Sequence, residues 1–169
     1  MQLRIMAKRP FKRKIKRKRH GASFWDHEYT NAEHLALSTT HSSDLEKFTR
    51  WLARRDRTDI VSAATSVCDI GCGNGRNLIY LSRTFGCSGI GLDTSTAAIA
   101  QAKVASKDLP LTYQVRSAAA ALPAPDASQS LGLDMMTSHF LLARDRTRLR
   151  DEIHRILQPG GFLFMKTFL

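Results

Sequence analysis

The chain has 169 residues, 43% of them hydrophobic, and a formal net charge of +11. This length suits one domain with a substantial core. No apolar run approaches the roughly 20 residues needed to cross a bilayer, and no apolar core follows the N-terminal charges, so we expect no membrane span and no secretory signal in the N-terminal arm. The three cysteines lack C-x-x-C spacing and clustered histidines, which argues against disulfides and a metal site and predicts a cytoplasmic location.

The positive charge is concentrated at the N-terminus. Residues 1–20 hold ten of the 26 Lys and Arg residues and no acid, which leaves 16 bases against 15 acids in residues 21–169. Such a run repels itself and buries little, so residues 1–22 are predicted to form a disordered basic arm. Contact of residues 8–19 with nucleic acid or another anionic surface would release counterions. The alternative is a solvated tail, or extra residues before a later start at Met6 or beyond.

Residues 23–60 are predicted to form a helical segment before the core. Trp25 and Tyr29 lie near its start, and an aromatic pair in this place is typical of a packing anchor. Residues 43–46, Ser-Asp-Leu-Glu, form a capping-box pattern. A helix is expected from Asp44 to about Arg55, because apolar residues repeat at helical spacing. These are Leu45, Phe48, Trp51 and Leu52.

Residues 61–169 alternate between strand and helix patterns. The predicted elements are 66–70, 76–85, 88–92, 95–106, 111–115, 130–136, 144–157 and 162–167. This alternation predicts an α/β fold, a Rossmann-like doubly wound parallel sheet in a three-layer α/β/α arrangement. Right-handed crossovers give the strand order 3-2-1-4-5. Ligands bind such sheets at the carboxyl ends of the strands, where the order reverses.

The most specific motif is Asp69-Ile70-Gly71-Cys72-Gly73-Asn74-Gly75, between the first predicted strand and the next helix. Its glycines allow positive φ and a close approach to a ligand, and the following helix directs its N-terminal N–H groups at that ligand. Asp93, at the tip of the second strand, suits the two hydroxyls of a ribose. Together these parts predict a pocket for a cofactor that contains a nucleoside.

The same motif distinguishes between cofactors. A dinucleotide fingerprint requires a glycine at position 76, where this chain has Arg76. Asp69 would repel a pyrophosphate but can accept hydrogen bonds from an ammonium group, directly or through water. S-adenosylmethionine carries both an ammonium and a sulfonium, so Asp69 and Asp93 favour that methyl donor.

From about Val67 onwards the chain resembles the class I S-adenosylmethionine-dependent methyltransferases, most closely the type 11 domain group. Besides the glycine loop and Asp93, Leu122-Pro123-x-Pro125-Asp126 resembles the segment before strand four. Leu149-x-x-Glu152-x-x-Arg155-x-Leu157-x-Pro159-Gly160-Gly161 resembles the following helix, turn and fifth strand. The resemblance implies cofactor-binding roles for Asp69, Gly71, Cys72, Gly73, Gly75, Asp93, Thr94, Ser117, Ala118 and Asp134. It also implies that the segment bearing Trp25 and Tyr29 folds over the cofactor or substrate.

Two departures from the family pattern are present. Residues 116–121 contain no acid to bond the adenine amino group, although Ser117 or backbone N–H groups can hold the ring. The family sheet continues into a hairpin of strands six and seven, which residues 61–169 do not include. Strand five would then be an apolar edge. We expect either that the chain is C-terminally truncated or that another copy or protein covers this edge, so self-association through it is one possibility.

The sequence does not identify the catalytic residues. Transfer from a sulfonium mainly requires the nucleophile to be held in line in a water-poor pocket. Asp134 and His139 are weak candidates, Asp134 as a pocket residue and His139 as a general base. The tip of strand four lacks the motifs that mark base-amine and cytosine C5 methylation. The acceptor is therefore an unidentified small molecule or RNA. The alternative function is a catalytically impaired domain that binds nucleic acid or a partner through its basic arm.

Overall fold

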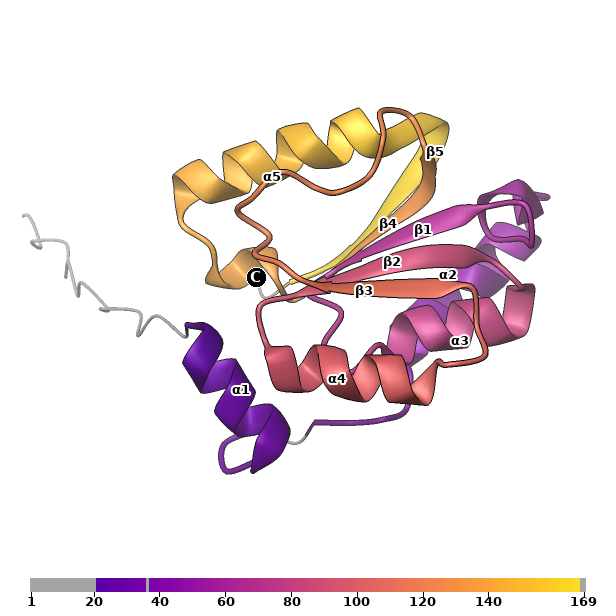
Figure 1. The fold of residues 1–169 in the computed structure, drawn as a ribbon. Coiled ribbons are helices and arrows are strands. Elements are labelled where there is room, and N and C mark those ends of the chain that lie inside the picture. Colours follow the sequence, from indigo (N-terminus) through magenta and orange to yellow (C-terminus); the bar gives the residue numbers. More distant parts are fainter. Residues whose placement is uncertain (1–20, 36, 168–169) are drawn as a thin grey trace, which may run out of the picture.

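The computed structural model describes residues 21–35 and 37–167 (Figure 1). The predicted arm at 1–22, apart from its last two residues, therefore lies outside the described residues. The helices are α1 (Ala22–Thr30), α2 (Ser43–Ala53), α3 (Arg76–Phe85), α4 (Thr96–Ala105) and α5 (Ala143–Ile156), with short 3-10 helices η1 (Thr58–Ile60) and η2 (Ser138–Phe140). The strands are β1 (Ser66–Ile70), β2 (Ser88–Asp93), β3 (Leu111–Val115), β4 (Gln129–Met135) and β5 (Leu157–Lys166).

The five strands form one parallel sheet in the order β3-β2-β1-β4-β5 (Figure 1). The predicted fold class and strand order are confirmed. In the register of the central strands, Asp69 lies opposite Gly91 of β2 and Leu133 of β4. The order reverses between β1 and β4, and the carboxyl ends of the strands face α1 at the left of Figure 1.

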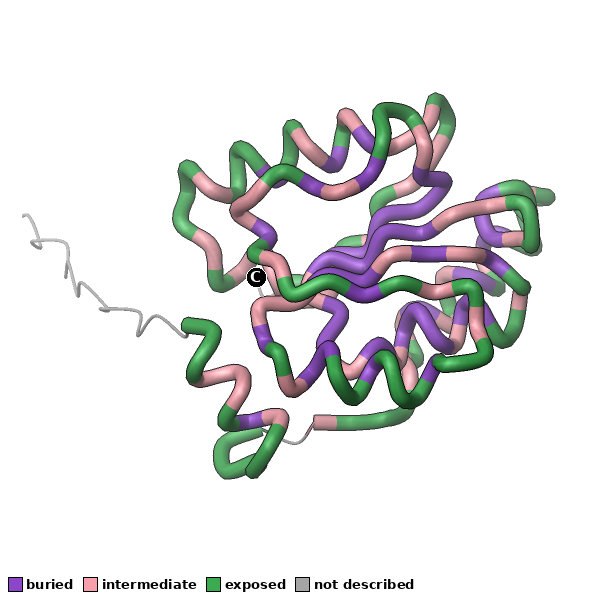
Figure 2. Tube along the Cα trace, in the orientation of Figure 1, coloured by how far each residue is buried: buried purple, intermediate pink, exposed green. Residues whose placement is uncertain are grey.

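Two apolar cores lie on the two faces of the sheet, and Figure 2 shows the buried trace concentrated in its central strands. One core joins the apolar sides of α2, α3 and α4 to β1 and β4, through residues such as Leu45, Leu78 and Leu131. The other joins α5 to β1, β2 and the loop before β4, through Ile70 and Ile153. These cores produce the predicted three layers.

The edge strand β5 is covered on the face that carries α2. The ring of Phe48 stacks on Phe164 with centroids 4.8 Å apart, and Trp51 contacts Phe162 edge-on. Within the described part of the chain no strand pairs with the outer edge of β5, where Leu163 and Met165 are 37% and 48% exposed. Self-association through this edge stays a prediction.

Three boundaries differ from expectation. Ser42, and not Ser43, caps α2: its side chain accepts the Asp44 N–H, and its own N–H donates to Asn77 of α3. The helix ends at Ala53, two residues early. β5 begins at Leu157 because a register shift opposite Gln129 and Leu131 accommodates the Pro-Gly-Gly segment before Phe162.

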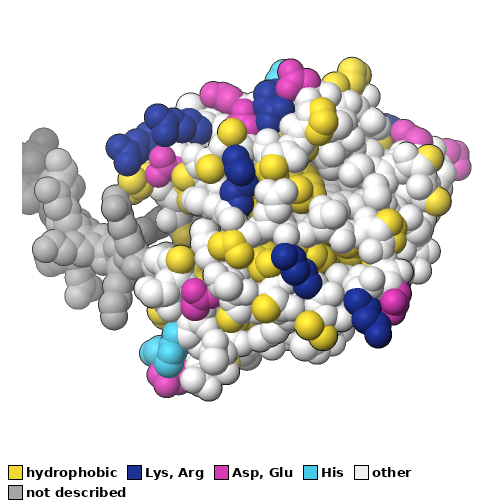
Figure 3. Space-filling model, in the orientation of Figure 1, with side chains coloured by type: hydrophobic (Ala, Val, Ile, Leu, Met, Phe, Trp, Pro, Cys, Tyr) yellow, Lys and Arg dark blue, Asp and Glu magenta, His cyan; other side chains and the backbone are white. Residues whose placement is uncertain are grey.

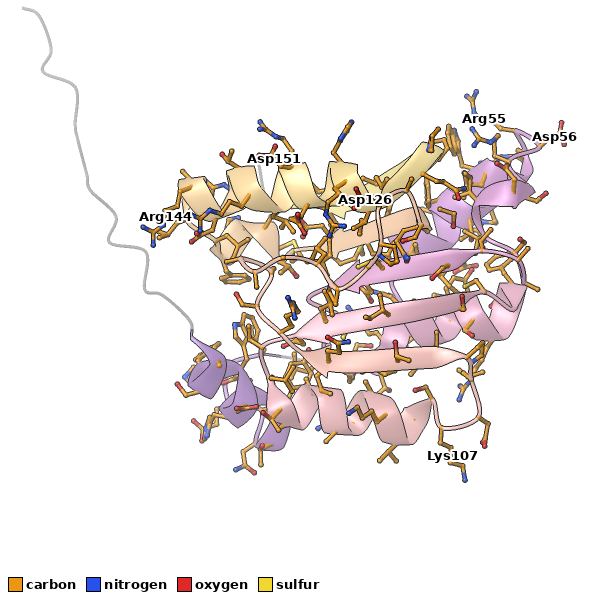
Figure 4. All side chains as sticks on the ribbon, turned by 45° about the horizontal axis from the view of Figure 1, so that its top comes forward. Arg55, Asp56, Lys107, Asp126, Arg144 and Asp151 are labelled. Atoms are coloured by element: carbon orange, nitrogen blue, oxygen red, sulfur yellow. The ribbon has the colours of Figure 1, made fainter. Side chains whose placement is uncertain are left out.

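One loop on the α5 side is held by a dense set of polar contacts. The guanidinium of Arg155 donates to the carbonyl oxygens of Leu122 and Ala124 and to the carboxylates of Glu152 and Asp126. The Glu152 carboxylate also accepts the Leu122 N–H at 2.7 Å. Figure 4 shows Asp126 in this loop beside α5. We call residues 122–126 with Glu152 and Arg155 the loop clamp.

The charged side chains of the described residues are dispersed over the surface shown in Figure 3. On the face shown in Figure 3, Lys and Arg side chains lie apart and do not gather into one patch. This agrees with the near-neutral balance of residues 21–169. None of the described helices is long and apolar enough to cross a membrane, and in the same residues no group of three or more His, Cys, Asp or Glu side chains could hold a metal ion.

Candidate cofactor site

A cavity of about 460 Å³ lies at the carboxyl ends of β1, β2 and β4. Of the predicted cofactor residues, Gly71, Asp93, Thr94, Ser117 and Ala118 line it. Asp69, Cys72, Gly73, Gly75 and Asp134 do not form its wall. The cavity thus coincides with the predicted edge of the sheet, and half of the predicted residues border it directly.

The glycine loop has the backbone conformation that its sequence predicts. Gly71 and Gly73 adopt φ values of +74° and +55°. A Cβ at Gly71 would lie 1.8 Å from Thr137 Oγ1, and one at Gly73 would lie 2.0 Å from Tyr29 Oη. Only glycine fits at either position without moving a neighbour.

Asp93 joins the loop to the second strand. Its carboxylate accepts the Gly73 N–H at 2.9 Å and the Ser95 N–H at 2.8 Å, and it also lines the cavity. Burial raises the pKa of Asp93, while the N–H donors of Ser95 and Gly73 oppose that rise. The carboxylate is therefore fixed in place at the position where hydroxyl groups of a ligand can donate to it.

Asp69 is the most unusual polar group of the site. It is 1% exposed, and among the described residues neither carboxylate oxygen has a hydrogen-bond partner. Burial, and then the negative charges of Asp93 and Asp134, raise the pKa of Asp69 to about 7. A buried carboxylate without a partner is costly. Its place two residues before Gly71 suits a cationic ligand group at the loop.

Asp134 lies at the end of β4, behind the cavity wall, and among the described residues its Oδ2 has no hydrogen-bond partner. Its side chain is fully buried, and Oδ1 accepts the N–H groups of Thr137 and Ser138 at 3.0 and 3.1 Å. It therefore holds the turn into η2 and does not meet the cavity. His139, the weak candidate for a base, lies in η2, contacts Phe140 edge-on and is not part of the cavity wall.

The helix α1 forms the opposite wall of the cavity through Ala22, Trp25 and Tyr29. Its Asp26 carboxylate accepts hydrogen bonds from the Ser95 hydroxyl and the Ala97 N–H, at the start of α4. Gln101 of α4 donates to the Tyr29 carbonyl at 2.6 Å. These contacts fasten α1 beside the cavity.

Several cavity residues were not predicted from the sequence. Met135, Met136, Thr137, Phe140 and Leu141 line it between β4 and α5, and Arg76 and Arg116 contribute cations. Met136 has a φ of +77°. Residues other than glycine rarely adopt a positive φ, so this value marks local backbone strain. Trp25 meets Phe140 edge-on with centroids 5.2 Å apart, so the two walls touch.

The fold and this edge define the class of protein: a Rossmann-like domain with a nucleoside-cofactor site at the switch point of its sheet. Residues 68–165 match the family described as "Methyltransferase domain". This match spans more than half of the chain, and the chain belongs to that family, as the resemblance to class I S-adenosylmethionine-dependent methyltransferases predicts.

Solved structures agree with the family match. An S-adenosylmethionine dependent methyltransferase from Mesorhizobium loti is 28% identical, with a TM-score of 0.59 over 73% of this chain and 54% of that one. A putative methyltransferase from a complex with the Haloferax volcanii Trm112 activator is 25% identical, with a TM-score of 0.61 over 83% and 58%. A methyltransferase from Thiobacillus denitrificans, in complex with S-adenosyl-L-homocysteine, shares the fold at 21% identity and a TM-score of 0.58 over 82% and 53%.

The chain spans about half the length of these proteins. No curated protein matches it significantly. The comparisons establish the family, the fold and S-adenosylmethionine as the methyl donor. They do not identify an acceptor, and they give no support to the alternative of a domain that has lost catalysis.

Proposed function

We propose that this chain binds S-adenosylmethionine at the glycine loop and transfers its methyl group to a small-molecule or RNA acceptor. The observation that carries the proposal is the buried, unpartnered carboxylate of Asp69 beside a glycine cradle. An ammonium group, reached directly or through water, is the partner that such a carboxylate lacks. A pyrophosphate would instead be repelled, so the same residue argues against a dinucleotide.

The remaining residues fit the other parts of the cofactor. Asp93 is placed to accept from ribose hydroxyls, and Thr94 lies next to it on the cavity wall. Ser117 and Ala118 border the part of the cavity next to β3, where the adenine is expected. Gly71, Cys72, Gly73 and Gly75 shape the loop, and Tyr29 covers it at Gly73.

When bound, the cofactor supplies a methyl group on a sulfonium. The protein residues have to hold an acceptor in line with that group and keep water away. Trp25, Phe140 and Leu141, with Met135 and Met136, provide an apolar wall for this purpose. Neither Asp134 nor His139 reaches the cavity, so we infer that positioning and desolvation carry the reaction and that no side chain of this wall acts as a base.

The segment 23–60 contributes a cover to this site in our proposal. α1 closes the cavity from the side opposite β4, and the Asp26 and Gln101 contacts join it to α4. Residues 8–19 precede it directly in the chain. Their contact with RNA is proposed from charge alone, since they lie outside the described residues.

Isothermal titration calorimetry with S-adenosylhomocysteine tests the cofactor part. We expect binding in the micromolar range and none with NAD, because Asp69 disfavours a pyrophosphate. If calorimetry detects no binding of S-adenosylhomocysteine at millimolar concentration, the proposal is wrong. The acceptor class can then be found by incubating the protein with labelled S-adenosylmethionine and separating RNA from metabolites of a cell extract.

A further inference from the structure

A second cavity of about 470 Å³ lies on the outer side of α3 and α4, away from the sheet. Residues 39–41, between α1 and α2, form its third side, and Figure 1 shows the chain that follows α1 running beneath α4. We call it the helix groove. It adjoins the cofactor cavity, because Arg76 lines both. The proposed methyl transfer does not require it.

The helix groove is cationic. Arg76 and Arg83 line it, and no acidic residue is among the described residues of its wall. The two arginines are seven residues apart on α3, which places them two turns apart, about 10 Å along the helix axis. Neither forms an ion pair within residues 21–35 and 37–167.

Both guanidinium groups are nevertheless held in place. Arg76 donates to the Thr40 carbonyl at 2.8 Å, and Arg83 donates to the Ala105 carbonyl at 3.2 Å. Each of these bonds uses one N–H of five. The arginines therefore keep donors for a ligand, and their planar forks match the oxygens of a phosphate.

An aromatic pair lies between the two cations on the groove wall. The rings of His41 and Tyr80 are stacked, with centroids 3.9 Å apart and an interplanar angle of 10°. The Tyr80 hydroxyl meets the Thr49 hydroxyl at 3.1 Å, which fixes the tyrosine. Rings on a basic groove are the surface on which bases of a single strand stack.

We propose that the helix groove binds a segment of single-stranded RNA, with phosphates at Arg76 and Arg83 and a base against the His41–Tyr80 pair. Two cations two turns apart exceed the reach of one phosphate, which favours a chain of phosphates over a free ion. The basic run at residues 8–19 adds charge of the same sign in the same chain. Gln101, which lines the groove, is bonded to α1, the helix that follows this run.

Fluorescence anisotropy of the full chain with a labelled oligouridine of about 12 nucleotides tests the proposal. Arg83→Ala should weaken binding about 3–10-fold and reduce the slope of log affinity against log salt by about 0.7. Arg83→Lys should recover most of the affinity, since it keeps the charge. Arg148→Ala is the matched control, because Arg148 is an exposed arginine on α5, on the other face of the sheet.

The proposal is overturned if Arg83→Ala binds RNA as tightly as the parent chain does. It is also overturned if Arg83→Ala and Arg148→Ala lose the same affinity, because the positive charge would then act without a defined site. Inorganic pyrophosphate and an oligoglutamate serve as competing probes. Arg83-dependent binding of either one without Arg83-dependent binding of RNA also overturns it. Thermal midpoints and S-adenosylhomocysteine affinity should be the same in all variants. Loss of cofactor binding in the parent chain refutes the proposed function and leaves the RNA result standing.

Discussion

The carboxyl edge of the sheet and the loop clamp both carry motifs of the methyltransferase family, yet Asp69 at the edge and Arg155 in the clamp are in opposite states. In the loop clamp, the Arg155 guanidinium has four partners and Glu152 binds both Arg155 and the Leu122 N–H. At the carboxyl edge, Asp69 is buried with neither oxygen bonded within the described chain. The first arrangement stabilises a loop, and the second is ready for a ligand.

The difference shows how equal motif matches can be separated into binding and structural roles. A motif whose buried polar groups satisfy one another has no need of a ligand, because folding already supplies the partners. A motif that leaves a buried charge unpaired must gain its partner from elsewhere or lower the stability of the fold. Variants at the edge should therefore change ligand affinity, with or without a change in stability, whereas variants at the clamp should change folding stability alone.

The largest effect is expected for Asp69→Asn, and it should have opposite signs in two measurements. The folded-state pKa of about 7 lies above the unfolded value of about 3.9, so ionisation in the folded state is penalised. The parent chain should lose stability as pH rises from about 4 to 7, on the order of 4 kcal/mol from this residue. Asn carries no charge and removes that loss. Affinity for S-adenosylhomocysteine should nevertheless fall.

Urea unfolding at pH 5 and pH 8, together with calorimetry, measures both effects. The variant should be more stable than the parent at pH 8, and the gain should shrink at pH 5, where the Asp69 carboxyl is largely protonated in the folded protein. The raised pKa of Asp93 adds pH dependence to both proteins, so only the difference between them counts. A variant that is less stable at pH 8 would show that Asp69 has a partner in the unbound protein.

Asp93→Ala should weaken S-adenosylhomocysteine binding by about 1.5–3 kcal/mol, the usual size for hydrogen bonds to a charged group. It should also lower stability, because the carboxylate holds the Gly73 and Ser95 N–H groups. Calorimetry with the parent and with Asp126→Ala as a distant control separates the two losses. An unchanged cofactor affinity would place the ribose elsewhere.

Arg155→Ala, in the loop clamp, should lower folding stability and leave cofactor affinity nearly unchanged. The carbonyl oxygens of Leu122 and Ala124 and the carboxylates of Glu152 and Asp126 lose their hydrogen bonds from Arg155, so we expect a destabilisation of about 2 kcal/mol in urea. Cofactor affinity, measured where the variant is fully folded, should stay within a factor of two of the parent. A loss of affinity larger than the loss of stability would mean that the loop clamp contributes to the site.

The sequence predicts the frame of this molecule well because local signals agree with the global fold. Strand and helix periods, the glycine loop and Asp93 all rely on short-range patterns that no distant residue overrides. The shift of the α2 cap to Ser42 has a tertiary cause, since Asn77 of α3 accepts the Ser42 N–H. The early start of β5 likewise depends on pairing with β4.

The residues that line the cavity are brought together by contacts between distant parts of the chain, so sequence patterns alone do not predict them. Met136 has no local preference for a positive φ, and its conformation accompanies a hydrogen bond from its N–H to the Lys166 carbonyl at the end of β5. Asp134 carries a pocket-type signal at a strand tip, but one of its carboxylate oxygens, Oδ1, bonds the turn into η2. Phe140 lies in the wall against Trp25 of α1, a contact between segments far apart in the sequence.

The smallest expected effect is a coupling between Tyr29 and Gly73 across the cover of the site. Gly73→Ala should cost about 1–2 kcal/mol from the positive φ alone, and its Cβ would also meet the Tyr29 hydroxyl oxygen at 2.0 Å. Tyr29→Phe removes that oxygen and leaves the ring carbon at 3.0 Å. The double variant should therefore recover about 0.5–1 kcal/mol of the loss, as a positive coupling in a double-mutant cycle of urea stabilities. Strict additivity would mean that α1 moves away from the glycine loop in the unbound protein, so that the site is covered only when the cofactor is present.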